Sequence, residues 1–281
     1  MPRLSKLYTN ENNFFFESSM TESTLRRRRT FIGVSLKMYF SPSRTKAYVE
    51  EFAGLITRDY GAVAADIVVL PDFLTVAHAA HVVPSPGAVG AQDCFWQPSG
   101  AFTGEISPAH LAELGVRFVE VGHAERRDLL AESDEITAKK VASAVKAGLA
   151  PIICVGEPVR RDVDAAAEFV NAQVTAALAQ IETVADSSAG QAQVVLAYEP
   201  VWAIGQPEPA PVSYINAVAA KIRHHVDANL SSVASIRIIY GGSAKPGLVS
   251  LLNPEVLDGL FIGRFGHQVS QFKIMLDEAL G

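Results

Sequence analysis

Cysteine is scarce in this sequence, which has only Cys94 and Cys154 among its 281 residues. The two cysteines are not spaced as Cys-x-x-Cys and both lie in apolar surroundings typical of strands, so no disulfide framework is expected. The seven histidines also lack metal-ligand spacing with cysteines or carboxylates. We therefore expect two buried, reduced thiols in a cytoplasmic protein, with no bound metal.

Long apolar runs and an excess of positive charge are missing too. No stretch of eighteen apolar residues occurs, so no membrane-spanning helix or membrane partner is predicted. The net charge of −6 argues against a nucleic-acid partner. Apolar residues make up 49% and charged residues 19% of the chain, a balance typical of a soluble globular protein. The length suits one large α/β domain with a sizeable core.

Residues 1–30 differ from the rest of the chain. They are polar, carry six basic and three acidic side chains, and contain an arginine run from Arg26 to Arg29. A transit peptide would be poor in acidic residues, and an anion-binding arginine patch is a weaker alternative. We predict a flexible N-terminal extension over residues 1–30.

From residue 31 onward, short apolar segments alternate with helical patterns. Most of the apolar segments lack polar alternation, as expected for strands buried on both faces. Eight strands with intervening helices over about 250 residues predict a closed (β/α)₈ barrel in a single domain, residues 31–281. A doubly wound open sheet is the alternative, but no Gly-x-Gly-x-x-Gly follows the first strand. The strands are expected at 31–34, 66–70, 88–91, 118–122, 150–155, 193–198, 236–240 and 259–262, and the clearer helices at 43–58, 134–147, 162–184, 211–229 and 268–280.

One segment, residues 197–205, carries the strongest chemical signal. The strand there ends in Glu199, and Pro200 follows at once and keeps Glu199 extended at the tip of the strand. A short loop that includes Gly205 comes next and can close over this carboxylate. A carboxylate placed in this way suits a general base that works out of contact with water.

Other strand ends also carry polar side chains, and chemistry in such a barrel sits at the carboxyl ends of the strands. Lys37 follows the first strand, where its charge would stabilise a developing oxyanion or a phosphate. His123 follows the fourth strand just before a predicted helix, whose N-terminus disfavours the charged imidazolium. Cys154 is read as a packing residue near the base.

Glycine-rich turns follow the last two strands, at residues 241–243 and 263–266. Glycine lets backbone N–H groups approach a phosphate, and this region is where the fold commonly binds one. We therefore predict that backbone N–H groups of these two turns, near Ser243, Gly263 and Arg264, bind a phosphate.

These motifs together resemble the triosephosphate isomerase family over the whole barrel. Residues 197–205, Ala-Tyr-Glu-Pro-Val-Trp-Ala-Ile-Gly, resemble the family's base segment and lid loop, and Gly-His-Ala-Glu-Arg-Arg at 122–127 resembles its Gly-His-Ser-Glu-Arg-Arg. The resemblance implies an aldose–ketose isomerase of small phosphorylated sugars that works through an enediolate and needs no cofactor. Glu199 is then the base, while neutral His123 and Lys37 stabilise the enediolate. Glu125 would orient Lys37, and the backbone near Gly205 in the lid loop would bind the phosphate together with the two glycine turns. The pairing of a glutamate base with a neutral histidine is carried over from what is known of this family.

The long loop from Asp93 to Ser107 resembles the family's interdigitating loop, which enters the partner subunit beside its active site. This resemblance implies a homodimer in which Thr103 reaches toward the partner subunit's Lys37. Asp93 stands where the family has asparagine.

Several positions depart from the family pattern. Ser35 and Leu36 replace Asn and Trp in Asn-Trp-Lys-Met, residues 206–209 replace a glycine-containing lid tip, and Arg264 replaces a glycine. The departures resemble a branch that isomerises four-carbon erythrulose phosphates, so we predict a tetrulose phosphate substrate, with Ser35 beside it. The alternatives are the glycolytic triose-phosphate isomerase and, more remotely, a catalytically silent barrel used for binding.

Overall fold

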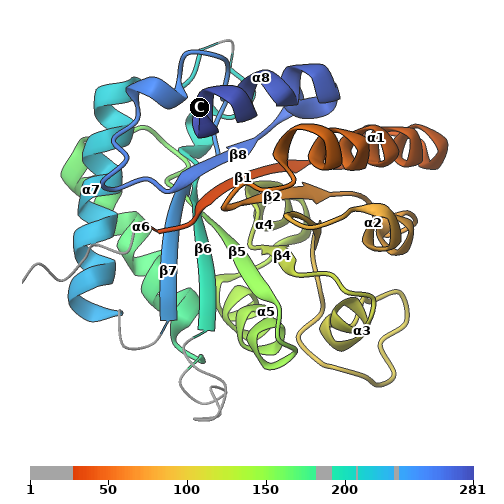
Figure 1. Cartoon of the computed structure of the whole chain (residues 1–281). Coiled ribbons are helices and arrows are strands. Elements are labelled where there is room, and N and C mark those ends of the chain that lie inside the picture. Colours follow the sequence, from red (N-terminus) through yellow and green to blue (C-terminus); the bar gives the residue numbers. More distant parts are fainter. Residues whose placement is uncertain (1–27, 182–191, 207, 231–233) are drawn as a thin grey trace, which may run out of the picture.

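Eight parallel strands close into a barrel that is wrapped by helices (Figure 1). The structure is a computed structural model, and it describes residues 28–181, 192–206, 208–230 and 234–281. The strands follow one another in chain order, and the last pairs with the first, from Phe31 beside Gly259 to Val34 beside Ile262. The predicted single-domain (β/α)₈ barrel is confirmed.

The strands lie within two residues of the predicted positions at nearly every end. They are β1 (Thr30–Ser35), β2 (Ala65–Leu70), β3 (Gly87–Ala91), β4 (Phe118–Val121), β5 (Ala150–Val155), β6 (Ala192–Tyr198), β7 (Ala234–Tyr240) and β8 (Gly259–Ile262). The α-helices are α1 (Pro42–Leu55), α2 (Val76–Val82), α3 (Pro108–Glu113), α4 (Ala124–Leu130), α5 (Asp134–Lys146), α6 (Val163–Leu178), α7 (Val212–Asn229) and α8 (Val269–Leu280).

Helix ends differ from the sequence prediction in two ways. The predicted helix 43–58 becomes an α-helix to Leu55 followed by a π-helical turn, η1 (Ile56–Tyr60). The predicted helix 162–184 ends at Leu178, and residues 182–184 lie outside the described part of the chain. Helices α2 and α3 were not predicted, because six or seven residues are too few to show a helical period. The helix expected directly after His123 is α4. Side-chain caps fix several starts: Ser41, Ser107, Ser133 and Asp162 each accept a backbone N–H of the first turn.

The core has two layers, because strand residues point alternately into the barrel and out toward the helices. Phe31, Phe118 and Phe261 belong to the inner cluster, and the rings of Phe31 and Phe118 meet edge to face at 5.3 Å. The larger cluster joins the outer faces of the strands to the helices. The inner layer thus fills the barrel and leaves the carboxyl ends of the strands to form a site.

The amino-terminal ends of the strands are held by buried carboxylates. Asp66 on β2 pairs with Arg237 on β7 at 2.6 Å and with Arg29 at 3.0 Å, and Arg28 pairs with Asp258 at 2.5 Å. The sequence assigned Arg28 and Arg29 to a solvated extension, but here their guanidinium groups add a further positive charge to carboxylates that also pair with Arg237 and Arg223. Three residues of the predicted extension, Arg28, Arg29 and Thr30, therefore lie in the described part and contact the barrel. The rest of the predicted extension, residues 1–27, lies outside the described part.

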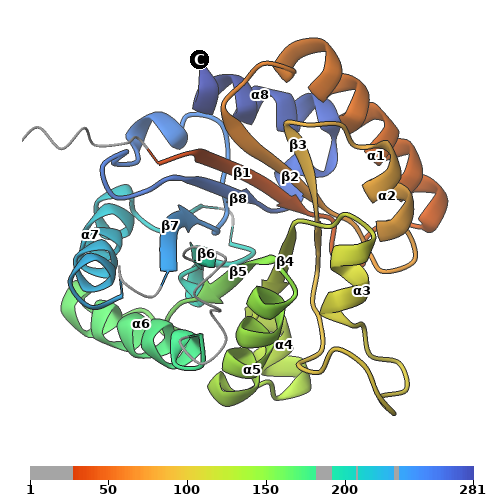
Figure 2. The ribbon, with the colours of Figure 1, turned by 60° about the horizontal axis from the view of Figure 1, so that its bottom comes forward.

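The loop between β3 and α3 projects from the side of the barrel (Figure 2). It is closed internally, because Phe95 N donates to Ile106 O at 2.8 Å and Ser107 Oγ donates to Pro98 O at 2.6 Å. Asp93, predicted as the start of the dimer loop, is buried instead, within 2.8 Å of Lys140 Nζ. A buried ion pair of this kind anchors the loop to α5, so the projecting part begins beyond Asp93. Among the helices in the described ranges, none is long and apolar enough to cross a membrane.

Candidate active site

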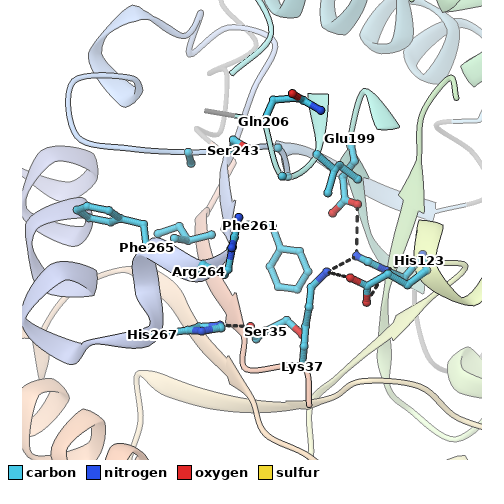
Figure 3. Close-up of a pocket in the computed structure, with 18 of the residues that line it drawn as sticks. Ser35, Lys37, His123, Glu199, Gln206, Ser243, Phe261, Arg264, Phe265 and His267 are labelled. Atoms are coloured by element: carbon cyan, nitrogen blue, oxygen red, sulfur yellow. Dashed lines mark hydrogen bonds and ion pairs between the residues drawn. The ribbon is translucent and has the colours of Figure 1, made fainter. Parts of the chain in front are cut away.

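A cavity of about 450 Å³ opens at the carboxyl ends of the strands. Every site residue predicted from the sequence lines it: Ser35, Lys37, His123, Glu125, Glu199, Gly205, Ser243, Gly263 and Arg264. In Figure 3, Lys37, His123 and Glu199 lie on one wall, while Ser243 and Arg264 lie across the cavity from them. The polar groups that suit proton transfer and the glycine-rich turns that suit a phosphate therefore face each other across one space.

The carboxylate of Glu199 lies at the end of β6 and is almost fully buried. Its Oε2 atom has no hydrogen-bond partner among the described residues, and it lies 3.7 Å from His123 Nε2. Burial, and then the nearby Glu120, raise the pKa of Glu199 to about 8. A carboxylate so poorly solvated is a stronger base than an exposed glutamate.

The chain leaves room for this base at two glycines. A Cβ atom on Gly241, at the end of β7, would come within 2.5 Å of Glu199 Oε1. A Cβ atom on Gly156 would come within 1.8 Å of the Glu199 carbonyl oxygen. Any larger residue at either position would displace the carboxylate or its backbone, so the neighbouring strand ends are shaped around Glu199.

His123 is the N-cap of α4, and its Nδ1 atom accepts the backbone N–H of Glu125 at 3.1 Å. A ring nitrogen that accepts a hydrogen bond carries no proton, so in the neutral ring the proton is assigned to Nε2, which faces the cavity. Burial, and next the positive charge of Lys37, lower the pKa of His123 to about 4. Burial therefore favours the neutral ring most strongly, whereas the sequence argument had relied on the helix end.

Lys37 brings a positive charge to the same point. Its Nζ atom lies 2.7 Å from Glu125 Oε1 and 3.1 Å from His123 Nε2. The pKa of Lys37 is raised; burial opposes this shift, and the hydrogen bond and charge of Glu125 outweigh it. Because Nζ and the assigned Nε2–H are both donors, an oxygen atom placed between them in the cavity would accept two hydrogen bonds.

The backbone of Lys37 is itself unusual, with a φ of 47°. A residue with a β-carbon rarely adopts this left-handed conformation, which costs about 1 kcal/mol or more. The Lys37 carbonyl accepts a hydrogen bond from Gln92 Nε2 at 3.1 Å, which helps to hold the turn. The Lys37 side chain lines the cavity at the barrel mouth.

The opposite wall joins the glycine turns to the lid loop. Ser243 Oγ donates to the carbonyl of Ala203 in the loop at 3.3 Å, and Arg264 begins the 3₁₀ turn η4 (Arg264–His267). The first N–H groups of such a turn have no partner within the turn, which suits them to bind an anion. The base of the lid is held by Trp202, whose Nε1 donates to Glu157 Oε1 at 2.8 Å.

Sequence reasoning missed one polar residue in the cavity. Glu120 of β4 is buried, and its Oε2 accepts a hydrogen bond from Ser35 Oγ at 3.2 Å. The available signal was strand alternation: in Phe-Val-Glu-Val, residues 118–121, the glutamate shares the inward face with Phe118. Cys154, predicted to pack near the base, lies with Sγ 3.8 Å from Glu199 Oε1, and burial raises the pKa of its thiol. Within the described ranges, no group of three or more His, Cys, Asp and Glu side chains could hold a metal ion.

Comparisons with known proteins agree with this geometry. The family described as triosephosphate isomerase matches residues 30–279. The L-erythrulose-1-phosphate isomerase of Pectobacterium atrosepticum is 44% identical over 255 residues, which cover 90% of this chain and 96% of that protein. The triosephosphate isomerases of Natranaerobius thermophilus and Streptococcus pyogenes are each 40% identical to it. These two alignments cover 84% and 89% of this chain, and 90% and 98% of the relatives. The chain therefore belongs to the triosephosphate isomerase family.

Proposed function

We propose that this isomerase shifts the carbonyl group of a tetrulose phosphate to the neighbouring carbon. The observation that carries the proposal is the polar pocket at Ser35, where a short hydroxyl side chain faces the buried carboxyl of Glu120 beside the catalytic wall. The L-erythrulose-1-phosphate isomerase of P. atrosepticum, 44% identical to this chain, supports the same substrate class.

The proposed reaction is a proton transfer within the substrate. Glu199 removes a proton from the carbon next to the carbonyl, and the electron pair moves to the carbonyl oxygen to give an enediolate. His123 Nε2–H and the Lys37 ammonium group, 3.1 Å apart, stabilise the charge on the oxygens. The hydroxyl proton on the neighbouring carbon passes to the former carbonyl oxygen, and Glu199 returns a proton to the former carbonyl carbon, which completes the isomerisation.

The four-carbon substrate changes the class of product. In a triose phosphate the carbonyl moves between an aldehyde and a ketone. In a tetrulose 1-phosphate it moves from carbon 2 to carbon 3, so both forms are ketoses, and the product is the tetrulose 4-phosphate. The same base and donors serve both reactions, because the bonds that break and form are equivalent.

The phosphate would lie on the wall opposite the base. The backbone at Gly205, Ser243 and Gly263 supports such a position, and the Arg264 side chain, exposed in the cavity lining, adds a positive charge. Closure of the lid would exclude water and protect the enediolate from loss of phosphate. Each proposed step uses side chains and backbone of this chain, so the scheme needs no cofactor.

A glycolytic triose-phosphate isomerase is the second candidate. It is favoured by the unaltered set of Lys37, His123, Glu125 and Glu199, and by the triosephosphate isomerases that are 40% identical to the chain. The same unaltered set argues against a catalytically silent barrel.

A substrate panel tests the proposal. Purified protein would be assayed with glyceraldehyde 3-phosphate and with tetrulose phosphates of both configurations, with product formation followed by NMR. We expect kcat/KM for one tetrulose phosphate to equal or exceed that for the triose phosphate. A strong triose preference with little tetrulose turnover would assign the protein to glycolysis, and no turnover of either would indicate a silent barrel.

We also propose that the active form is a homodimer in the cytoplasm. The projecting loop carries the exposed Thr103 and Phe102, and Met38, next to Lys37, is 94% exposed. A second subunit would cover this apolar surface near the site. The two cysteines are free and buried, a state that suits a reducing compartment.

A further inference from the structure

Glu120 stands out in the interior of the barrel. It lies on β4 between Val119 and Val121, and it is 3% exposed. Bulky apolar side chains usually fill this layer of a (β/α)₈ barrel, and a buried carboxyl destabilises the fold unless it is well paired. A destabilising group in the lining of an active site calls for a functional explanation.

The contacts of Glu120 are not those of a structural ion pair. Its Oε2 accepts the Ser35 hydroxyl at 3.2 Å, and its Oε1 lies 3.7 Å from Cys154 Sγ. A thiol is only a weak donor, and no lysine or arginine in the described ranges forms an ion pair with Glu120. By contrast, Glu132 pairs with Lys140 at 2.5 Å. Glu120 therefore keeps hydrogen-bonding capacity for a group that enters the cavity.

Glu120 and the base flank the same point in space. His123 Nε2 lies 3.7 Å from Glu199 Oε2 and 3.9 Å from Glu120 Oε1. Cys154 Sγ lies 3.8 Å from Glu199 Oε1 and 3.7 Å from Glu120 Oε1. A carbon that gives its proton to Glu199 must sit at this point, so a substituent on that carbon lies within reach of Glu120.

The substituent is what distinguishes the two candidate substrates. The reacting carbon of dihydroxyacetone phosphate bears two hydrogens, whereas in a tetrulose 1-phosphate one of them is replaced by CH₂OH. We propose that Glu120, assisted by Ser35, binds this terminal hydroxyl and gives the enzyme its preference for four-carbon substrates. This inference rests on the proposed tetrulose phosphate function.

The ionisation of Glu120 is compatible with that role. Burial raises its pKa to about 7, although the positive charge of Lys37 lowers it. Near neutral pH the group can thus either accept a hydrogen bond from a hydroxyl or donate one to it. Glu120 also acts on the base, because its charge raises the pKa of Glu199. That role would act equally on every substrate, so a comparison of substrates separates the two.

The test uses three substrates and two variants of the full chain. The substrates are the preferred tetrulose 1-phosphate, its 4-deoxy analogue without the terminal hydroxyl, and dihydroxyacetone phosphate. Glu120→Val removes the hydrogen-bonding group, and Glu120→Gln keeps one. Phe118→Leu, on the same inward face of β4, controls for general disturbance of the interior, and melting temperatures verify folding.

For Glu120→Val, we expect kcat/KM for the tetrulose phosphate to fall about 10- to 100-fold, the usual effect of losing a hydrogen bond to a charged group. At pH 9, where the base is ionised in both proteins, turnover of dihydroxyacetone phosphate should fall far less. Glu120→Gln should keep part of the preference, and Phe118→Leu should keep all of it. In the wild-type enzyme, kcat/KM for the 4-deoxy analogue should be lower than that for the tetrulose phosphate by a factor close to the loss caused by Glu120→Val. In Glu120→Val, kcat/KM should be nearly the same for these two substrates.

Three results would overturn the inference. An equal loss on both substrates would make Glu120 a positioning residue for Glu199. An undiminished tetrulose preference in Glu120→Val would show that the hydroxyl binds elsewhere, while the proposed function would stand. If the wild-type enzyme turns over only the triose phosphate, the proposed function fails and this inference fails with it.

Discussion

Replacement of Glu199 by glutamine should make the protein more stable while it abolishes most of the activity. Burial raises the pKa of this carboxyl from its ordinary value of 4.5 to about 8. Between these two pH values the unfolded chain binds fewer protons than the folded chain, so wild-type stability falls as the pH rises through this window. Glutamine has the same shape and carries no charge, so the stability of Glu199→Gln should not fall with pH in this way.

The size of the effect follows from the pKa difference. One pKa unit corresponds to about 1.4 kcal/mol of unfolding free energy. The raised pKa of Glu199 therefore lowers the unfolding free energy of the wild type by up to about 5 kcal/mol above pH 8, by about 3 kcal/mol at pH 7 and by less than about 1 kcal/mol at pH 5. Even a third of the value above pH 8 would raise the melting temperature by about 3 to 6 °C in a chain of this size. Turnover should drop at least ~10²-fold, the low end for the loss of a general base.

Scanning calorimetry of Glu199→Gln and wild type at pH 5, 7 and 9 measures this difference. Glu157→Gln is a matched control, because Glu157 is equally buried but accepts hydrogen bonds from Trp202 Nε1 and the Tyr214 hydroxyl, both at 2.8 Å. The free energy of unfolding of that variant should be about 2 kcal/mol lower than that of the wild type, because the hydrogen bonds to the carboxylate are replaced by weaker ones. The reasoning would be refuted if the gain for Glu199→Gln were the same at pH 5 and pH 9, or if its turnover were near normal.

Three further predictions concern pH, the N-terminus and assembly. Because the base must be ionised, kcat/KM should rise with pH, reach half its maximum near pH 8 and level off above about pH 9. Glu120→Gln should move this rise to lower pH, since the charge of Glu120 raises the pKa of Glu199; a pH–rate profile unchanged by that variant would contradict the coupling. Deletion of residues 1–27, which show no apolar periodicity, should leave melting temperature and activity nearly unchanged, and a large drop in either would mean that the segment packs on the barrel. Light scattering should find a dimer, which Thr103→Arg should weaken together with activity; a fully active wild-type monomer at assay concentration would exclude the loop-mediated dimer.

The repeating pattern of short buried strands and helices was enough to predict the barrel. A strand that is covered on both faces must be apolar throughout, and such a run can be recognised from a few consecutive residues. The same pattern places Lys37, His123 and Glu199 within two residues of strand ends, and parallel strands bring their carboxyl ends to one rim. The roles of Lys37 and His123 were predicted from the resemblance of their motifs to the triosephosphate isomerase family. The short helices α2 and α3 were not predicted, because one or two turns do not establish a period.

Other features depended on contacts between residues far apart in sequence. Glu120 and Ser35 are separated by 85 positions and meet only because β1 and β4 face each other across the barrel interior. Arg28 has the composition of a solvated tail, yet it pairs with Asp258, 230 positions away. The raised pKa of Glu199 and the lowered pKa of His123 likewise come from burial. Burial and through-space charge are properties of the packed barrel, so the sequence determined which reactive groups are present, and the tertiary structure decided how they ionise and what lies beside them.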